Sequence, residues 1–114
     1  MAKLERILHG DFYSVVNTVT QGIQDSSVSA TLEDMSDFVG GDSKCSVRVF
    51  ERYSYMGGNR VSMNVTFFQH KYGEIHLSAI TSGGSQAMFF KINTWGEESF
   101  LDKLAEILSE MEAK

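Results

Sequence analysis

The stretch RVSMNVTFFQHKYGEIHLSAITS, residues 60–82, contains two runs in which apolar and polar residues alternate. Such alternation is typical of strands with one buried face, because successive side chains of a strand point to opposite faces of the sheet. The apolar residues of both runs occupy odd positions, namely Val61, Met63, Val65, Phe67, Ile75, Leu77 and Ala79. Opposed residues share a face, so the stretch predicts a hairpin with a three-residue turn at 71–73 that pairs Phe68 with His76.

The preceding run, residues 44–56, also alternates and predicts a third strand. Its odd positions include Cys45, Val47, Val49, Tyr53 and Tyr55. We therefore assign the odd positions to the core face. A three-residue loop at 57–59 keeps that face continuous with the next strand, because it opposes Met56 to Arg60.

Further strands are predicted on both sides of this group. Residues 28–33 alternate, and the acidic, glycine-containing segment 34–43 that follows is interpreted as a loop. Residues 3–8 are either a short strand or irregular, and we favour the strand. With the apolar stretch 86–92 they complete the set of expected strands.

Two helices are expected, one before and one after the sheet. Asp11 is a suitable N-cap for a helix over 11–24, whose apolar residues recur at intervals of three and four. Thr94 and Glu97 match a capping box, which predicts a second helix from that point. Its apolar stripe consists of Phe100, Leu101, Leu104, Ile107, Leu108 and Met111.

These elements predict an α+β fold. An antiparallel meander of about five strands carries an N-terminal and a C-terminal helix packed on the odd face, which gives a two-layer sandwich. The chain has 114 residues and no internal repeat or low-complexity linker, so we expect a single α+β domain over residues 1–114.

Composition narrows the classes of function. Fifteen Asp and Glu against ten Lys and Arg give a net charge of −5, which disfavours nucleic acid as a partner. The N-terminal residues interrupt their apolar stretch with charges, and no run is long enough for a membrane helix, so we expect neither a secretory signal nor a membrane partner. A single cysteine, Cys45, favours a cytoplasmic protein.

The segment TSGGSQ, residues 81–86, is the first candidate site. Gly83 to Ala87 resembles the nucleophile elbow of serine hydrolases, but a predicted strand follows it and all three histidines precede Ser85, so we predict no catalytic residue. Both phosphate-binding fingerprints are also missing. A connection between two strands is the simplest interpretation, and an anion nest is the alternative. The residues of that weaker site are Ser82, Gly83, Gly84, Ser85 and Gln86.

Metal and cofactor chemistry has no support in the sequence. The three histidines and Cys45 lack zinc-site spacing, and the acidic loop does not fit a calcium loop, so no metal or cofactor is expected. Glu51 falls on the assumed core face, where an unpaired carboxylate is costly. A bulge, a place at the sheet edge or an ion pair with Arg60 would each explain it.

The even positions of the strands form the second candidate site, a polar face left open by the helices. It carries Arg48, Arg52, Asn64, Thr66, His76 and Ser78, with Phe50 and Phe68 embedded among them. This face is interpreted as ordinary solvated surface, as a dimer interface, or as a platform for a small ligand.

The phrases ERYSYMGGNRVS, residues 51–62, and SAITSGGSQAMFFKINT, residues 78–94, resemble a family of short bacterial proteins of unknown function. The similarity extends from about Gly10 to Leu104. It implies a bacterial, cytoplasmic protein, and it implies no activity, cofactor or catalytic residue.

Two hypotheses about function follow. The first is a non-enzymatic protein that self-associates, as a homodimer, through the even sheet face or a strand edge, with Phe50 and Phe68 as interface residues. The second is a small-molecule or anion-binding protein, or an enzyme, that uses the 82–86 loop with Arg48, Arg52 or His76.

Overall fold

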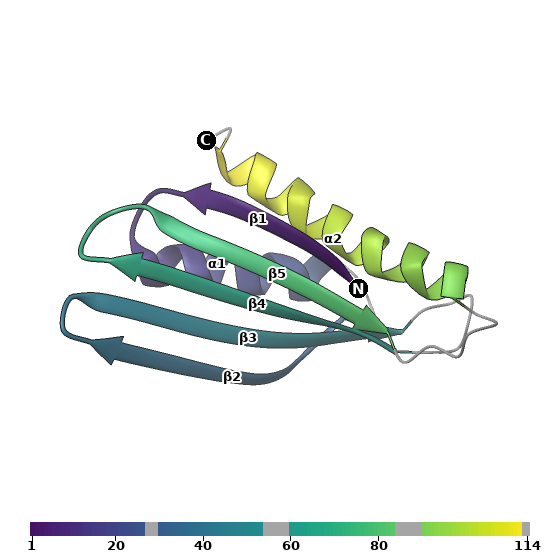
Figure 1. Ribbon diagram of the computed structural model, residues 1–114. Helices are drawn as coiled ribbons and strands as arrows, with labels where there is room; N and C mark the ends of the chain where they lie inside the picture. The colour runs from purple at the N-terminus through teal and green to yellow at the C-terminus, as the bar shows by residue number, and fades with distance from the viewer. Residues whose placement is uncertain (27–29, 54–59, 84–89, 113–114) are drawn as a thin grey trace.

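The hairpin predicted from residues 60–82 lies at the centre of a five-stranded antiparallel sheet (Figure 1). The computed structural model describes residues 1–26, 30–53, 60–83 and 90–112, and for 90–97 the backbone only. The strand order is β1-β5-β4-β3-β2. The elements are β1 (Ala2–Leu8), α1 (Phe12–Ser26), β2 (Thr31–Gly40), β3 (Ser43–Tyr53), β4 (Arg60–His70), β5 (Ile75–Gly83) and α2 (Phe90–Glu112).

The register of the β4–β5 hairpin is the predicted one. Phe68 pairs with His76, and the turn lies at 71–73. Lys71 adopts a φ of 58°, in the left-handed region, and the Gly73 amide donates a hydrogen bond of 3.1 Å to the His70 carbonyl. The three-residue turn therefore keeps the odd positions of β4 and β5 on the same face of the sheet, as predicted.

The predicted face of β3 is wrong. Tyr53 pairs with Arg60 and Phe50 with Met63, so even positions of β3 share a face with odd positions of β4. The predicted pairing of Met56 with Arg60 is therefore wrong too, and the loop 57–59 itself lies outside the described residues. The reason is that the large Phe50 side chain takes the core side, where the buried Ser46 and Arg48 satisfy their polar groups on Asp37.

Residues 34–40, predicted as a loop, belong to β2. This strand pairs with β3 as far as Gly40 opposite Ser43, and a register shift between Leu32 and Asp34 marks a bulge. The two-residue turn that remains has Gly41 at a φ of 56°. Of the strand predicted at 28–33, residues 28 and 29 lie outside the described residues. The observed strand β2 begins at Thr31.

Both predicted helices form, but only the start of the first helix agrees with the prediction. The Asp11 carboxylate accepts a hydrogen bond of 3.0 Å from the Ser14 amide, which confirms the predicted cap of α1. In contrast, α2 begins at Phe90, so the strand predicted over 86–92 is wrong at residues 90–92. Residues 86–89 of that predicted strand lie outside the described residues. Thr94 lies inside the helix, so the capping box predicted there is wrong as well.

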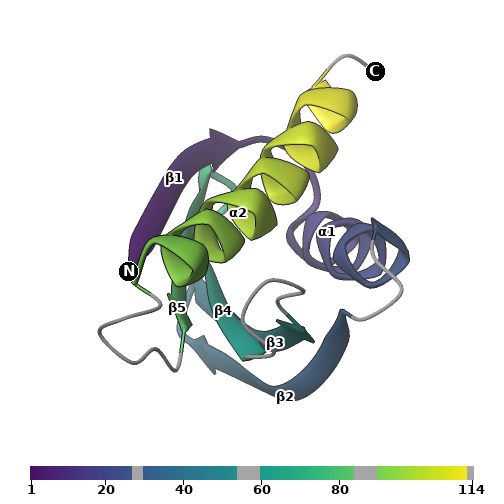
Figure 2. The same ribbon diagram turned by 90° about the vertical axis from the view of Figure 1, so that its right-hand side faces the viewer.

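The two helices cover one face of the sheet, as predicted. Figure 2 shows both on the concave side of the curved sheet, where they also lie beside each other. The core between the layers includes Val16, Val19 and Ile23 of α1, Phe100, Leu104 and Leu108 of α2, and Phe50, Val61, Met63, Val65, Phe67, Ile75, Leu77 and Ala79 of the sheet. The α+β two-layer arrangement is thus confirmed. Within the described ranges, no helix has both the length and the apolar character needed to cross a membrane.

Candidate functional site: the uncovered face of the sheet

The middle of the sheet face that points away from the helices, called the outer face below, is built from three transverse rows of paired residues. The first row runs from β2 to β1 through Phe38, Cys45, Phe68, His76 and Ile7. The second contains Ser36, Val47, Thr66, Ser78 and Glu5. The third contains Asp34, Val49, Asn64, Ile80 and Lys3.

The middle of the outer face contains no charged residue. We define the central panel as the nine residues that β3, β4 and β5 contribute to these rows. They are Cys45, Val47, Val49, Asn64, Thr66, Phe68, His76, Ser78 and Ile80. None of these nine is Asp, Glu, Lys or Arg, although such residues make up 22% of the chain. Depletion of charge at the centre of a patch is the compositional sign of an interface core.

Large apolar side chains on the outer face are exposed to solvent. Phe68 and Ile80 are each 42% exposed, and Phe38 at the β2 edge is 62% exposed. Cys45, Val47 and Val49 are half-buried by their neighbours. Contiguous exposed apolar surface of this kind marks an interaction site more often than singly scattered apolar residues do.

Charges lie around the central panel. Lys3 and Glu5 occupy β1, and Asp34 lies on β2. At one end of the sheet the Glu51 carboxylate lies 2.7 Å from the Arg60 guanidinium, and hydrogen bonds with Tyr53 and Glu51 raise the Arg60 pKa. Glu51 thus pairs with Arg60, one of the explanations considered for it, and does so on the outer face.

A shallow hollow of about 670 Å³ opens on the outer face over β1, β4 and β5. The outer-face residues along it are Glu5, Ile7, Thr66, Phe68, His76 and Ser78. It offers an aromatic ring, hydroxyls, an imidazole and a carboxylate to a small molecule. Volumes of this order are common for ligand sites, although such sites are usually more enclosed.

The structure separates several residues that the sequence analysis placed together. Arg48 and Arg52 lie on the helix side of β3, whereas His76 lies on the outer face, so the proposed grouping on one open face is wrong. Arg48 is only 5% exposed, and the Arg52 guanidinium lies 4.7 Å from the centre of the Phe100 ring. Both corrections follow from the changed face of β3.

The two interface candidates also differ in position. Phe50 is fully buried under the helices, so its placement on an open face is wrong, while Phe68 lies on the outer face as expected. The outer-face residues that the sequence analysis missed include Val47 and Val49, which it assigned to the core. The signals that could have found them are the large Phe50 side chain at an even position of β3 and the carboxylate of Glu51 at an odd one.

Only the start of the glycine-rich segment is described. The Ser82 hydroxyl oxygen lies 2.9 Å from that of Ser62, and Gly83 pairs with Val61 at the end of β5. Gly84, Ser85 and Gln86 lie outside the described residues. The hydroxyl pair joins two neighbouring strands, which is the structural role expected of a strand end.

The buried Arg48 belongs to a polar cluster that ties β2 to β3. Its Nη1 donates a hydrogen bond of 3.0 Å to Asp37 Oδ1, and the Ser46 hydroxyl donates one of 2.6 Å to the same oxygen. The hydrogen bond from Ser46 and then that from Arg48 lower the pKa of the Asp37 carboxyl. The buried guanidinium is therefore paired, and the cluster stabilises the outer strand of the sheet.

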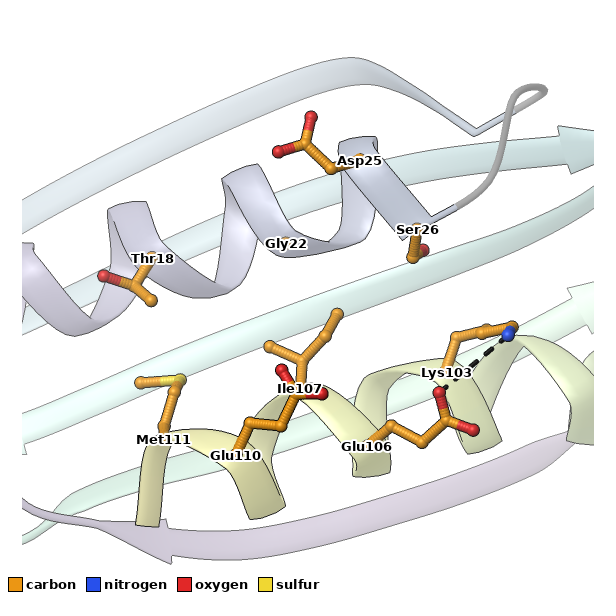
Figure 3. Close-up of a pocket in the computed structure, with 9 residues that line it drawn as sticks. All are labelled: Thr18, Gly22, Asp25, Ser26, Lys103, Glu106, Ile107, Glu110 and Met111. Atoms are coloured by element: carbon orange, nitrogen blue, oxygen red, sulfur yellow. Dashed lines mark ion pairs between the residues drawn. The ribbon is translucent and has the colours of Figure 1, made fainter. Parts of the chain in front are cut away.

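A second hollow, of about 390 Å³, lies between α1 and α2 (Figure 3). Ile107 points from α2 toward α1, where a Cβ atom on Gly22 would lie only 3.0 Å from its Cγ2. Lys103 Nζ lies 3.8 Å from a carboxylate oxygen of Glu106. The close approach at Gly22 makes this hollow part of the helix–helix contact. Across the described part of the chain, no group of three His, Cys, Asp or Glu side chains is arranged to hold a metal ion.

The fold and this surface define the protein's class: a two-layer α+β protein whose sheet has one face covered by two helices and one face open. The chain belongs to a family of unknown function, DUF6054, whose family model matches residues 1–112. No curated protein and no solved structure gives a significant match to the chain.

Proposed function

We propose that this protein is a binding module without catalytic chemistry that forms a homodimer through its outer face, and that it does so in the bacterial cytoplasm. The observation that carries the proposal is the central panel, nine uncharged positions on a face that the helices leave uncovered. A second copy of the same surface would remove the exposed Phe68 and Ile80 side chains from water. The single cysteine supports the reducing compartment.

The size of the outer face supports a dimer. Five strands, most of them nine to eleven residues long, cover about 24 Å by about 30 Å, or roughly 700 Å². A standard interface takes about 800 Å² from each partner. Because the sheet curves toward the helices, this area is the upper limit of the contact, which is centred on β4 and its neighbours. This limit is of the order that a stable dimer needs, with charges at the rim and apolar residues at the centre.

The charges at the rim favour one dimer geometry. A two-fold axis that runs parallel to β4, midway between two stacked sheets, places β1 of one protomer over β2 of its partner. Lys3 then lies opposite the partner's Asp34, because the two residues belong to the same row. In the same way Ile7 lies opposite the partner's Phe38. Opposite charges and apolar side chains are thus matched on both sides of the axis.

Charge reversal tests this geometry. Lys3→Glu or Asp34→Lys alone places like charges together at two symmetric contacts, and we expect each to weaken the dimer about three- to tenfold. The double variant restores opposite charges and should recover the wild-type dissociation constant, as measured by sedimentation equilibrium at low salt. Glu98→Lys, an exposed reversal on α2, is the control. A double variant that is weaker than either single variant would rule out the proposed axis.

The hollow beside His76 supports a second candidate, the binding of a small molecule that carries a ring and a hydrogen-bonding group. Phe68 would stack on the ring, while His76 and Ser78 would meet its polar atoms. A thermal-shift screen tests this function. Ligand binding predicts a compound that raises the melting temperature of the wild type but not of His76→Ala or Phe68→Ala. Together with a protein that is monomeric at micromolar concentration, this result would favour ligand binding over dimerisation.

A further inference from the structure

β2 (Thr31–Gly40) is an edge strand, and no described strand pairs with its second side. It pairs with β3 on one side, and Figures 1 and 2 show no described element beyond its other side. All of its ten residues are exposed except the half-buried Leu32. In an edge strand, alternate residues point their N–H and C=O groups away from the sheet, so about five residues of β2 direct backbone groups outward. One of these groups, the Met35 N–H, already donates a hydrogen bond of 2.8 Å to Asp34 Oδ1.

The opposite edge of the sheet is less accessible. β1 (Ala2–Leu8) lies next to α2 in the fold, and Ala2, Leu4 and Leu8 pack into the core. A helix beside an edge is one of the ways in which proteins keep that edge from pairing. Of the two edges, β2 is therefore the one that can accept another strand.

Most devices that protect an edge are missing from β2. It is ten residues long and contains no lysine and no proline. The bulge between Leu32 and Asp34 lies near its start, so the six residues from Met35 to Gly40 continue in a regular register. An inward-pointing charge can also block an edge, but the Asp37 carboxylate is already paired with Arg48 and Ser46.

The charge of β2 indicates which strand it would accept. Glu33, Asp34 and Asp37 are acidic, and no Lys or Arg balances them within the strand. Antiparallel pairing with the β2 strand of a second copy would add the same acidic residues along one edge, and although Arg48 pairs with Asp37 in each copy, the carboxylates of Glu33 and Asp34 would repel. A strand that carries Lys or Arg would instead be attracted to this edge.

We propose that the free edge of β2 binds a basic, extended segment of another protein by strand addition. Backbone hydrogen bonds along Ser36 to Gly40 supply the affinity, and the carboxylates of Glu33 and Asp34 favour Lys and Arg in the added strand. The exposed Phe38 and Val39 side chains, 62% and 67% exposed, lie beside the added strand on opposite faces and favour apolar residues at the neighbouring positions. A dimer formed through the outer face leaves this backbone edge free, so the inference does not depend on the proposed function.

A defined peptide tests the inference. Fluorescence polarisation of a labelled ten-residue peptide with alternating Lys and Val or Thr should show saturable binding at micromolar concentration. The same peptide with Glu in place of Lys should bind at least tenfold more weakly. Two analogues with N-methyl groups on alternate amides, one set in each phase, separate strand addition from simple charge attraction. One of the two should lose binding while its charge is unchanged, and equal binding of both analogues would overturn the proposal.

Variants of the chain locate the site. Ser36→Lys and Glu33→Lys should each weaken binding of the basic peptide about tenfold. Glu98→Lys changes the net charge as Glu33→Lys does but lies on α2, so it should leave the affinity within about twofold. Circular dichroism of each variant checks that it is folded. Phe68→Glu, which is designed to break the dimer, should keep peptide binding. Equal weakening by Glu33→Lys and Glu98→Lys would show that net charge alone attracts the peptide and would overturn the assignment to β2.

Discussion

Phe50 of β3 pairs with Met63 of β4, and both side chains are fully buried beneath the helices. This pair determines which face of β3 is covered by the helices and which face is exposed. Because Phe50 points to the core, its neighbour Val49 points to the outer face, and with it Val47 and Cys45. The apolar character of the uncovered face is thus a direct consequence of the direction of one phenylalanine.

Replacement of Phe50 tests the assignment of the faces. Phe50→Ala removes a fully buried ring and should lower the free energy of unfolding by about 3–5 kcal/mol. Phe38→Ala is the same substitution at a position that is 62% exposed, and we expect it to lower the free energy of unfolding by less than about 1 kcal/mol. Urea denaturation of both variants measures the difference. Equal losses would contradict the register of β3.

The Asp37 cluster predicts a pH dependence of stability. Its carboxyl pKa is lowered from 3.8 in the folded state by the bonds from Ser46 and Arg48. The unfolded chain therefore binds a proton first as pH falls, so the stabilisation is fully present above about pH 4 and is lost as pH falls through the lower, folded pKa.

The variant Asp37→Asn isolates this contribution. Because the carboxylate is partly exposed, we expect it to lower the free energy of unfolding by only about 1 kcal/mol at pH 7. The difference from the wild type should shrink below pH 4. Glu112→Gln, at an exposed position on α2, is the control. A difference that stays constant from pH 7 to pH 2 would contradict an ionised Asp37 in the cluster.

Gly22 tests the contact between the two helices. Alanine at this position of α1 gains up to about 1 kcal/mol of helix propensity, but its Cβ would lie 3.0 Å from Ile107 Cγ2. Overpacking of this kind costs about 1–3 kcal/mol, so Gly22→Ala should be destabilising by about 1 kcal/mol. In an Ile107→Ala background the same change should become stabilising. Thermal unfolding of the four proteins of this double-mutant cycle gives the answer, and additive effects would show that the helices do not touch there.

The sequence was most informative where alternation is strict. The Phe68–His76 pair of the β4–β5 hairpin is predicted correctly, because the apolar residues of both strands other than Phe68 and Ile80 lie on one face and one turn length keeps those faces together. The first helix was equally clear, since Asp11 caps a run with a single apolar stripe. Local pattern and global fold agree at both places.

The sequence was least informative where two faces or two structures compete. In β3, most apolar residues occupy odd positions and Phe50 is the only one at an even position, so counting apolar residues indicated the wrong face. In β2, acidic residues and glycines resemble a loop, and the pairing with β3 that makes the segment a strand involves residues distant in the chain. The start of α2 was missed for a similar reason, because the β-branched and aromatic residues near Phe90 favour a strand locally.

The face error also moved the candidate site. With β3 reversed, Arg48 and Arg52 leave the uncovered face and the apolar residues Val47 and Val49 replace them. The expected polar platform becomes an apolar panel with polar edges. That change strengthens the argument for a protein partner over an anion, since the cations expected to bind the anion lie on the other side of the sheet.

The measurement that tests dimerisation through the outer face most directly is sedimentation velocity of the wild type, Phe68→Glu and Tyr13→Glu at micromolar concentration. Phe68 and Tyr13 are both 42% exposed, but Tyr13 lies on α1, away from the outer face. We expect a dimer for the wild type and for Tyr13→Glu, and a folded monomer for Phe68→Glu, because a carboxylate in the apolar centre would be buried without a partner. A wild-type monomer, or a dimer that survives Phe68→Glu unchanged, would contradict the account.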